Sequence, residues 1–255
     1  MSPIDLELVS SRLMPGEIQW SVHYQPDCES TQELARDALL EGAREGWAIV
    51  TDHQRAGRGR QGRVWMAPPG KALLLSLVLQ PAVDVLAKLP LLAGLAVAGA
   101  IEISTGISPD LKWPNDVLVR GRKLAGMLVE RPAGAGVIIG VGVNVSQLAA
   151  ELPAGATSLA VELGRPPARE PLLAALLNDL GNSYERADRE GVAWVVPAWR
   201  SRSSMLGQPV RLVRDGQTIE AVAEDITEIG GLRLRTADGV WFDVIAGEVE
   251  QVRPA

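Results

Sequence analysis

The chain has 255 residues, of which 47% are hydrophobic and 22% charged, and its formal net charge is −6 at pH 7. This composition excludes a disordered or fibrous protein, and the length allows one large domain or a domain of about 150–200 residues with a smaller partner. The acidic balance, with a pI of about 5.1, argues against a general nucleic-acid binder, which needs a net basic face.

Cysteine usage and apolar runs indicate the compartment. Cys28 is the only cysteine, which excludes an intramolecular disulfide and a thiolate zinc site. The first residues lack the basic-then-apolar order of a signal peptide. The apolar runs at 72–80 and 89–103 are shorter than the ~18–20 residues that span a bilayer. We expect a soluble, cytoplasmic protein with no membrane partner.

The first half of the chain predicts helices packed on a sheet. Ser30, with Glu33 three residues later, is typical of a capping box at a helix start. Residues 47–54 and 72–80 read as buried strands, and the mostly apolar stretch 86–104 predicts a helix against the sheet.

The next hundred residues continue this pattern. Residues 110–130 predict a short strand, a Trp-Pro-Asn-Asp turn and a hairpin around 120–123. Residues 136–146 form another buried-strand pattern, and helical patterns cover 170–184 and 192–204.

After Gly207 the pattern changes to short alternating strands. Asp-Gly pairs at 215–216 and 238–239 are hairpin-turn signals. We therefore expect an α+β fold with a mixed helix-and-sheet domain at 1–206 and a small all-β barrel at 207–255.

The segment "QRAGRGRQGRVW", residues 54–65, contains the pattern G-x-G-x-x-G at Gly57, Gly59 and Gly62. A dinucleotide-binding turn needs a helix directly after the third glycine. Here two prolines and a strand-like run follow, so the pattern does not support a nicotinamide dehydrogenase.

The same segment concentrates positive charge. Arg55, Arg58, Arg60 and Arg63 lie within nine residues, and residues 54–70 contain no acidic residue. Glycines between arginines let the backbone approach an anion while guanidinium groups bind it in a bidentate manner. We expect the loop to order around a phosphate-bearing ligand; the alternative is a solvated basic loop.

Two further stretches carry polar groups suited to a nucleotide. In "KWPNDV", Lys112, Asn115 and Asp116 can bind phosphate or polar ligand atoms, and Lys123 follows in "KLAGMLVE". Asn144 ends the strand "GVGVNV" and suits recognition of a base or ribose. The alternatives are an exposed turn with two lysines and an ordinary strand end.

Together, "GRGRQGRVW", "KWPNDV…RKLAGMLVE" and "GVGVNV" resemble the biotin protein ligase family in order and spacing, and the resemblance covers about residues 18–253. It implies a class II synthetase-like domain, with a mixed or antiparallel sheet and helices on one side, plus a small SH3-like C-terminal β-barrel. It also implies a two-step reaction: biotin and ATP, with Mg²⁺, give biotinyl-5′-AMP, and a lysine of a biotin carboxyl carrier domain then accepts the biotinyl group.

The resemblance assigns roles residue by residue. The implied biotin contacts are Ser30, Thr31, Gln54, Arg58, Gly59, Arg60 and Lys123. The implied ATP contacts are Arg60, Arg63, Trp65, Lys112, Asn115 and Asn144. The implied catalytic residues are Arg58, Arg60, Lys112, Asp116 and Lys123. No metal ligand is assigned. The family usually reads Ser-Thr-Asn where this chain has Gln32 after Thr31, and Gln32 is left out of the predicted site.

The resemblance also bears on the partners of the protein and on alternative functions. Only about 17 residues precede the predicted catalytic domain, so we expect no DNA-binding domain and no DNA partner; a homodimer is compatible with the family. The alternatives are a lipoate or octanoate ligase or transferase of the same fold, and a non-catalytic biotin-sensing regulator.

Five other residues are expected to have structural rather than catalytic roles. His23 and His53 lack partners at metal-ligand spacing, and Trp194 and Trp199 lie on a predicted helix. Cys28 is expected to be a small buried residue rather than a nucleophile.

Overall fold

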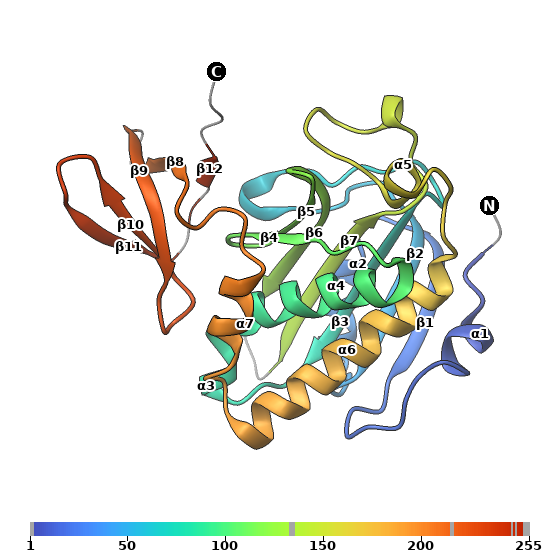
Figure 1. The fold of residues 1–255 in the computed structure, drawn as a ribbon. Helices are drawn as coiled ribbons and strands as arrows, with labels where there is room; N and C mark the ends of the chain where they lie inside the picture. Colours follow the sequence, from blue (N-terminus) through green and yellow to red (C-terminus); the bar gives the residue numbers. More distant parts are fainter. Residues whose placement is uncertain (1–2, 133–135, 215–216, 246, 248, 252–255) are drawn as a thin grey trace.

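A seven-stranded mixed sheet forms the centre of the molecule, and a second, five-stranded sheet follows it in the chain (Figure 1). The computed structural model describes residues 3–132, 136–214, 217–245, 247 and 249–251. The helices are α1 (Leu6–Ser10), α2 (Thr31–Leu40), α3 (Val83–Leu86), α4 (Leu89–Thr105), α5 (Leu159–Leu163), α6 (Arg169–Glu190) and α7 (Val195–Ser201), with short 3₁₀ turns η1 (Arg60–Gly62) and η2 (Ala149–Glu151). The strands are β1 (Ser21–Cys28), β2 (Trp47–Gln54), β3 (Ala72–Leu79), β4 (Asp110–Lys112), β5 (Asp116–Val119), β6 (Arg122–Glu130), β7 (Val137–Asn144), β8 (Pro209–Arg214), β9 (Gln217–Ile226), β10 (Leu232–Thr236), β11 (Trp241–Val244) and β12 (Val249–Gln251).

The large sheet has the strand order β1-β2-β3-β7-β6-β5-β4. β1 and β2 are parallel, and the other neighbours are antiparallel. All eight residues of β3 are buried, because both faces of this central strand are covered, and its sequence accordingly shows no polar alternation. The predicted strands at 47–54, 72–80 and 136–146 are confirmed.

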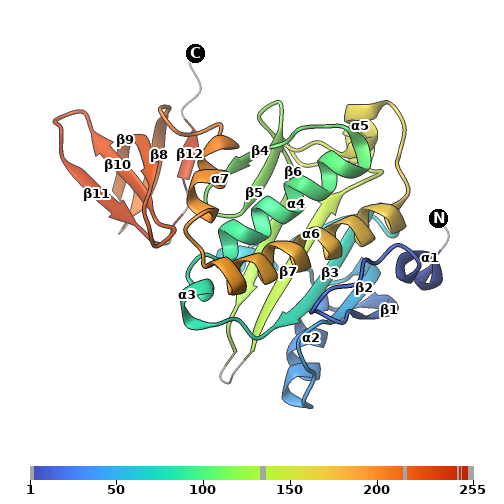
Figure 2. The same ribbon diagram turned by 60° about the horizontal axis from the view of Figure 1, so that its bottom comes forward.

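Two long helices cover one face of this sheet (Figure 2). α4 packs on the sheet and α6 packs on α4. α4 begins at Leu89 rather than at 86, with Pro90 in its first turn, where a missing N–H costs nothing. It ends where Gly106 adopts a left-handed φ of 75°. α6 runs past the predicted end at 184 to Glu190, whereas α7 is shorter than predicted.

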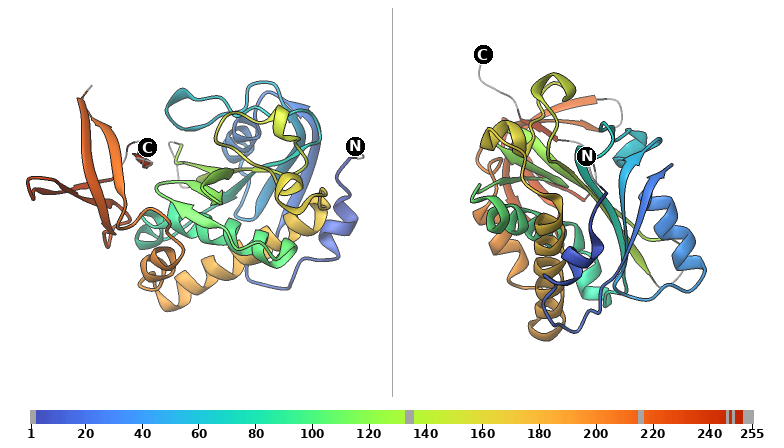
Figure 3. Two further views of the ribbon diagram at one scale, coloured as in Figure 1. Left: turned by 45° about the horizontal axis from the view of Figure 1, so that its top comes forward. Right: turned by 90° about the vertical axis from the view of Figure 1, so that its right-hand side faces the viewer.

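α2 lies on the opposite face of the sheet (Figure 3). Its Ala35 packs with Val78 and Ile138 in a small separate apolar cluster. Ser30 caps the helix by accepting a 3.3 Å hydrogen bond from the Gln32 N–H. The predicted α+β fold is confirmed: α4 and α6 cover one face of the sheet, and α2 lies on the other.

The five-stranded sheet is antiparallel, in the order β11-β10-β9-β8-β12. The predicted turn at 238–239 joins β10 to β11, whereas 215–216 lies outside the described residues. Trp113 Nε1 donates to Gly230 O at 3.0 Å, and Arg200 donates to Asp225 at 2.9 Å. These contacts attach the small sheet to the larger part of the molecule. The division into domains at 206 remains our proposal.

Candidate active site

Two adjoining pockets lie on the sheet face that carries α2, and both are bordered by the arginine-glycine loop, residues 55–65. The first is lined by the predicted residues Ser30, Thr31, Gln54, Arg58, Gly59, Trp65, Asn115 and Lys123. The second is lined by the predicted residues Arg60, Arg63, Lys112, Asn115, Asp116 and Lys123. Asn115 and Lys123 line both.

The inner end of the first pocket is a hydrogen-bonded group of hydroxyls and amides. Thr31 donates to Gln54 Oε1 from its backbone N–H at 2.8 Å and from its hydroxyl at 3.0 Å. The Ser76 hydroxyl lies 2.9 Å from both Thr31 Oγ1 and Gln32 Oε1. Ser30, Thr31, Gln32 and Ser76 are each at most 3% exposed. These groups can bind a small ligand with both donors and acceptors.

The arginine-glycine loop folds back on itself as a small hairpin. Trp65 N–H donates to Gly57 O at 2.9 Å, and Gly59 N–H donates to Arg63 O at 2.8 Å. Gly62 turns the tip with a φ of 74°, a conformation that glycine adopts without strain. The chain then continues into strand β3, so the expectation that no dinucleotide-type helix follows Gly62 is confirmed.

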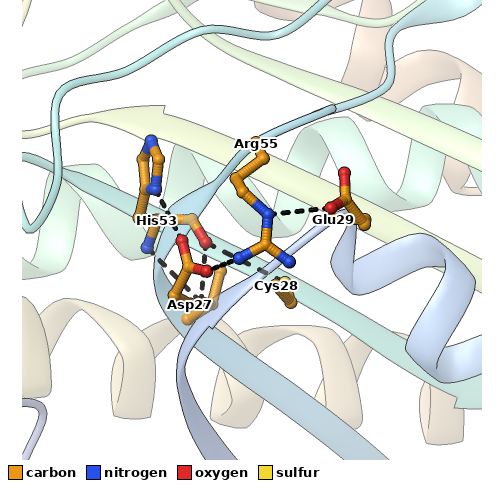
Figure 4. A network of polar contacts seen from close by, with 6 residues as sticks. Asp27, Cys28, Glu29, His53 and Arg55 are labelled. Atoms are coloured by element: carbon orange, nitrogen blue, oxygen red, sulfur yellow. Dashed lines mark hydrogen bonds and ion pairs between the residues drawn. The ribbon is translucent and has the colours of Figure 1, made fainter.

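The four loop arginines have different surroundings. Arg55 is bound to β1 by ion pairs with Asp27 and Glu29, and Asp27 also contacts His53 Nδ1 at 2.7 Å (Figure 4). Arg58 lies 3.5 Å from Glu130. The segment itself contains no acidic residue, but these two arginines are paired with carboxylates that are distant in sequence: Asp27 on β1, Glu29 just after β1 and Glu130 on β6.

At the base of the loop, Trp65 is seated on strands β6 and β7. A Cβ built on Gly142 would lie 2.6 Å from Trp65 Cε2, and one built on Gly126 would lie 3.1 Å from Cζ3. Gly126 and Gly142 are paired across the two strands, so together they leave a shallow slot for the indole ring. Lys123 Nζ lies 5.7 Å from the centroid of this ring.

The second pocket concentrates positive charge beside one carboxylate. Lys123 Nζ lies 2.6 Å from Asp116 Oδ1, and Arg60 donates to Asn115 Oδ1 at 3.3 Å. Asn115 Nδ2 in turn donates to Met127 O at 2.7 Å, which fixes the amide. Gly247 and Val249 of the C-terminal part also line this pocket. The pocket suits a polyanion.

One predicted residue lies in neither pocket lining. Asn144 is 5% exposed; its Nδ2 donates to Thr157 O at 3.0 Å, and its Oδ1 accepts from Gln147 Nε2 at 2.8 Å. These bonds hold the segment after β7 against the strand end. The adenine contact of Asn144 stays a prediction.

The structure also adds residues that the sequence did not indicate. Gln32, left out of the predicted site, lines the first pocket together with Ser76, Gly140 and Gly142. For Ser76, Gly140 and Gly142 the signal is alternation, because every second residue of β3 and β7 faces this side of the sheet. Only the pairing of the strands shows which set faces the pocket.

The residues expected to be structural lie apart from the pockets. Cys28 is buried, and burial raises the pKa of its thiol. Trp199 is 2% exposed. Arg186 Cζ lies 4.4 Å from the centroid of the Trp194 ring. Within the described ranges there is no group of three or more side chains suited to hold a metal.

None of the helices in the described part of the chain combines the length and the apolar composition that a membrane-spanning helix requires.

Comparison with known proteins gives concordant matches over nearly the whole chain. The Biotin/lipoate A/B protein ligase family model matches residues 25–144, and the Biotin protein ligase C terminal domain model matches residues 205–251. The biotin–[acetyl-CoA-carboxylase] ligase of Mycobacterium tuberculosis is 35% identical over 98% of this chain and 97% of that protein. The corresponding ligase of Paracoccus denitrificans is 36% identical over 76% and 85%. The solved Aquifex aeolicus biotin protein ligase in complex with biotin and ATP superposes with a TM-score of 0.80 at 30% identity, covering 92% of this chain and 99% of that one.

Proposed function

Because the chain belongs to the biotin protein ligase family, we propose that it converts biotin and ATP into biotinyl-5′-AMP and transfers the biotinyl group to a lysine of a biotin carboxyl carrier domain. The observation that carries this proposal is the continuity of the two pockets. A buried hydroxyl-and-amide end adjoins a cationic pocket, and Lys123 and Asn115 line both. One ligand can therefore extend from a polar ring to a reacting carboxylate.

The inner end of the first pocket matches a ureido ring. Such a ring offers two N–H donors and one carbonyl acceptor, and the Ser30 and Thr31 hydroxyls can accept from the N–H groups. The two hydrogen bonds from Thr31 to Gln54 Oε1 orient the Gln54 carboxamide, so its NH₂ group can donate to the ligand. The apolar lining by Leu74, Met127 and Val141 suits the thioether ring and the alkyl chain.

The first step joins two anions. A biotin carboxylate oxygen attacks the α-phosphorus of ATP, the bond from that phosphorus to the bridging oxygen of the β-phosphate breaks, and pyrophosphate leaves with the electron pair. Cationic donors offset the repulsion between carboxylate and phosphate and the charge that develops on the phosphoryl oxygens. Lys123, Lys112 and Arg60 are the groups we assign to this task, with Arg63 toward the triphosphate.

The second step consumes the mixed anhydride. The neutral amine of the acceptor lysine attacks the biotinyl carbonyl carbon, a C–N bond forms, the C–O bond to the phosphate breaks, and AMP leaves; the amine loses one proton. Arg58, Gly59 and Arg60 of the loop cover the carboxyl end of the site, and in our proposal they retain the adenylate until the acceptor arrives.

Mg²⁺ fits this site as an ion that arrives with ATP. Asp116 is the one acidic side chain among the described residues that line the two pockets, so the lining offers too few carboxylates for a cage made by the protein alone. When bound, the ion would supply positive charge to the phosphates, and Asp116 would hold its water shell while Lys123 turns to the ligand.

The test is biotin-dependent exchange of labelled pyrophosphate into ATP by the purified protein, followed by transfer to a carrier domain detected as a mass gain of one biotinyl group. Exchange that needs both biotin and Mg²⁺ supports the proposal. Exchange with lipoate or octanoate instead of biotin would establish the sibling enzyme, and biotin binding without exchange would establish a non-catalytic sensor.

A further inference from the structure

Gln32 carries a buried amide group with an unused hydrogen-bonding end. Its side chain is in the first turn of α2, and the residue is 3% exposed. Oε1 accepts from the Ser76 hydroxyl at 2.9 Å. Nε2 is buried and has no hydrogen-bond partner among the described residues. A buried donor without a partner is unfavourable, which indicates that the position is prepared for a ligand.

The Ser76 hydroxyl orients the amide of Gln32 when its one proton is donated to Oε1. Nε2 then lies at the opposite end of the carboxamide. The space for this arrangement comes from Gly140 on β7, because a Cβ there would lie 2.6 Å from Gln32 Oε1. Gln32 lines the first pocket with Ser30, Thr31 and Gln54, so its free donor lies among the groups that we assign to the ureido ring.

We propose that Gln32 is a specificity-determining residue whose Nε2 donates to the carbonyl oxygen of the ureido ring. This inference rests on the proposed function. The carbonyl oxygen is the only strong acceptor of the ring, since its two nitrogens are donors. An asparagine, which the family resemblance leads one to expect here, is one methylene shorter and could not both keep the Ser76 bond and extend as far into the pocket.

A swap of hydrogen-bonding character tests the proposal. In 2-iminobiotin the carbonyl is replaced by a group that is protonated at neutral pH and donates. The full-length Gln32→Glu variant keeps the shape of the side chain and the acceptor for Ser76 but places an acceptor where Nε2 was. Titration calorimetry of biotin and 2-iminobiotin should show biotin binding weakened by about 10–100-fold and 2-iminobiotin binding strengthened.

Two further variants make the result decisive. Gln25→Glu introduces the same chemical change at an exposed position of β1 and should leave the affinity ratio of the two ligands unchanged. Gln32→Met keeps the length of the side chain but removes its amide group, and it should weaken biotin binding about 10-fold. This variant supplies the measurement if Gln32→Glu does not fold.

The outcomes separate the inference from the function on which it rests. If the wild-type chain binds neither ligand, the proposed function fails. If the wild-type chain binds biotin but the Gln32 variants weaken both ligands by the same factor, Gln32 is merely structural and this inference is overturned.

Discussion

At the scale of single residues, position in the fold separates arginines that are equivalent in the sequence. Arg55 is held by Asp27 and Glu29 at the edge of the sheet, whereas Arg60 reaches the second pocket and contacts Asn115. Lys123 sits on strand β6 and lines both pockets. A rigid strand should position a charge for the chemistry, and a loop should retain the product.

This difference predicts distinct kinetic defects. Lys123→Ala should lower the rate of biotin-dependent pyrophosphate exchange by roughly 10²–10³-fold, because it removes charge next to the reacting phosphate. Arg60→Ala should still form the adenylate but release it, seen as free biotinyl-5′-AMP in a quenched reaction. Arg55→Ala, from the same loop but outside both pockets, is the matched control. Equal rates for all three variants would contradict the assignment.

At the scale of elements, the loop is attached to the sheet through Trp65. The slot left by Gly126 and Gly142 admits the indole ring, and the ring determines where the hairpin of residues 57–65 lies. A side chain at Gly142, where the three atoms nearest to an added Cβ all belong to Trp65, should therefore alter the loop.

Gly142→Ala should raise the rate of tryptic cleavage after the loop arginines and the rate of adenylate release by about 10-fold each, because overpacking of ~1–3 kcal/mol displaces the ring. Trp65→Phe in the Gly142→Ala background should restore slow cleavage, since the smaller ring vacates the crowded position. Gly181→Ala in α6, where a Cβ would meet Trp20 at an ordinary 3.5 Å, should behave as wild type. An unchanged cleavage rate in Gly142→Ala would disprove the proposal that Trp65 positions the loop.

The interface between α4 and α6 predicts a pH dependence. Asp179 on α6 lies against Gly99 of α4, and burial raises the pKa of its carboxyl group to about 6 from 3.8, with Arg202 opposing the shift. Because the pKa of Asp179 is higher in the folded state than in the unfolded state, its ionisation lowers the free energy of unfolding as pH rises from about 4 to 6. Above pH 6 this reduction in the free energy of unfolding stays constant.

Asp179→Asn should therefore be more stable than wild type at pH 7 by about 1–2 kcal/mol, a value discounted because the side chain is only half-buried. The difference should vanish near pH 3.5. Urea unfolding of both proteins at the two pH values measures it, and a difference independent of pH would assign the effect to packing alone.

At the scale of the whole molecule, one buried network joins three distant segments. Asp52 on β2 accepts from Tyr24 on β1 at 2.6 Å and from Arg169 at the start of α6 at 2.7 Å. The pKa of the Tyr24 hydroxyl is raised to about 12, first by burial and second by its hydrogen bond to Asp52. Gly70 N–H donates to Asp52 O at 2.8 Å, so the network also fixes the end of the segment that follows the arginine-glycine loop.

Removal of the 6%-exposed Arg169 as Arg169→Met should lower the free energy of unfolding by about 3–5 kcal/mol, because Asp52 is left as a largely buried charge without its ion-pair partner. Chemical denaturation measures the loss. Arg186→Met on the exposed face of the same helix, where the ion pair with Glu190 is solvated, should change stability by less than about 1 kcal/mol. Similar losses for the two variants would show that burial of the pair is unimportant.

Much of the architecture could be predicted because local patterns report burial directly. The uninterrupted apolar strand at 72–80, the apolar helix near 86–104 and the change to alternating strands after 207 each depend on neighbours in sequence. Helix ends were less accurate: the predicted helix began at 86, but Leu86 ends the short helix α3, and α4 starts at Leu89, which places Pro90 in its first turn. The side of the sheet taken by α2 has no local signal.

The sequence by itself determined the composition of the site, because residue types and order within 54–65, 112–123 and 140–145 limit which chemistry is available. Only the tertiary structure decided how these residues combine: that Arg55 is paired with the carboxylates of Asp27 and Glu29 at the end of β1, that Asn144 bonds to the segment after β7, and that Gln32 lines the first pocket. The physical reason is that hydrogen bonds and ion pairs depend on distance in space, and strand pairing brings together residues that are far apart along the chain.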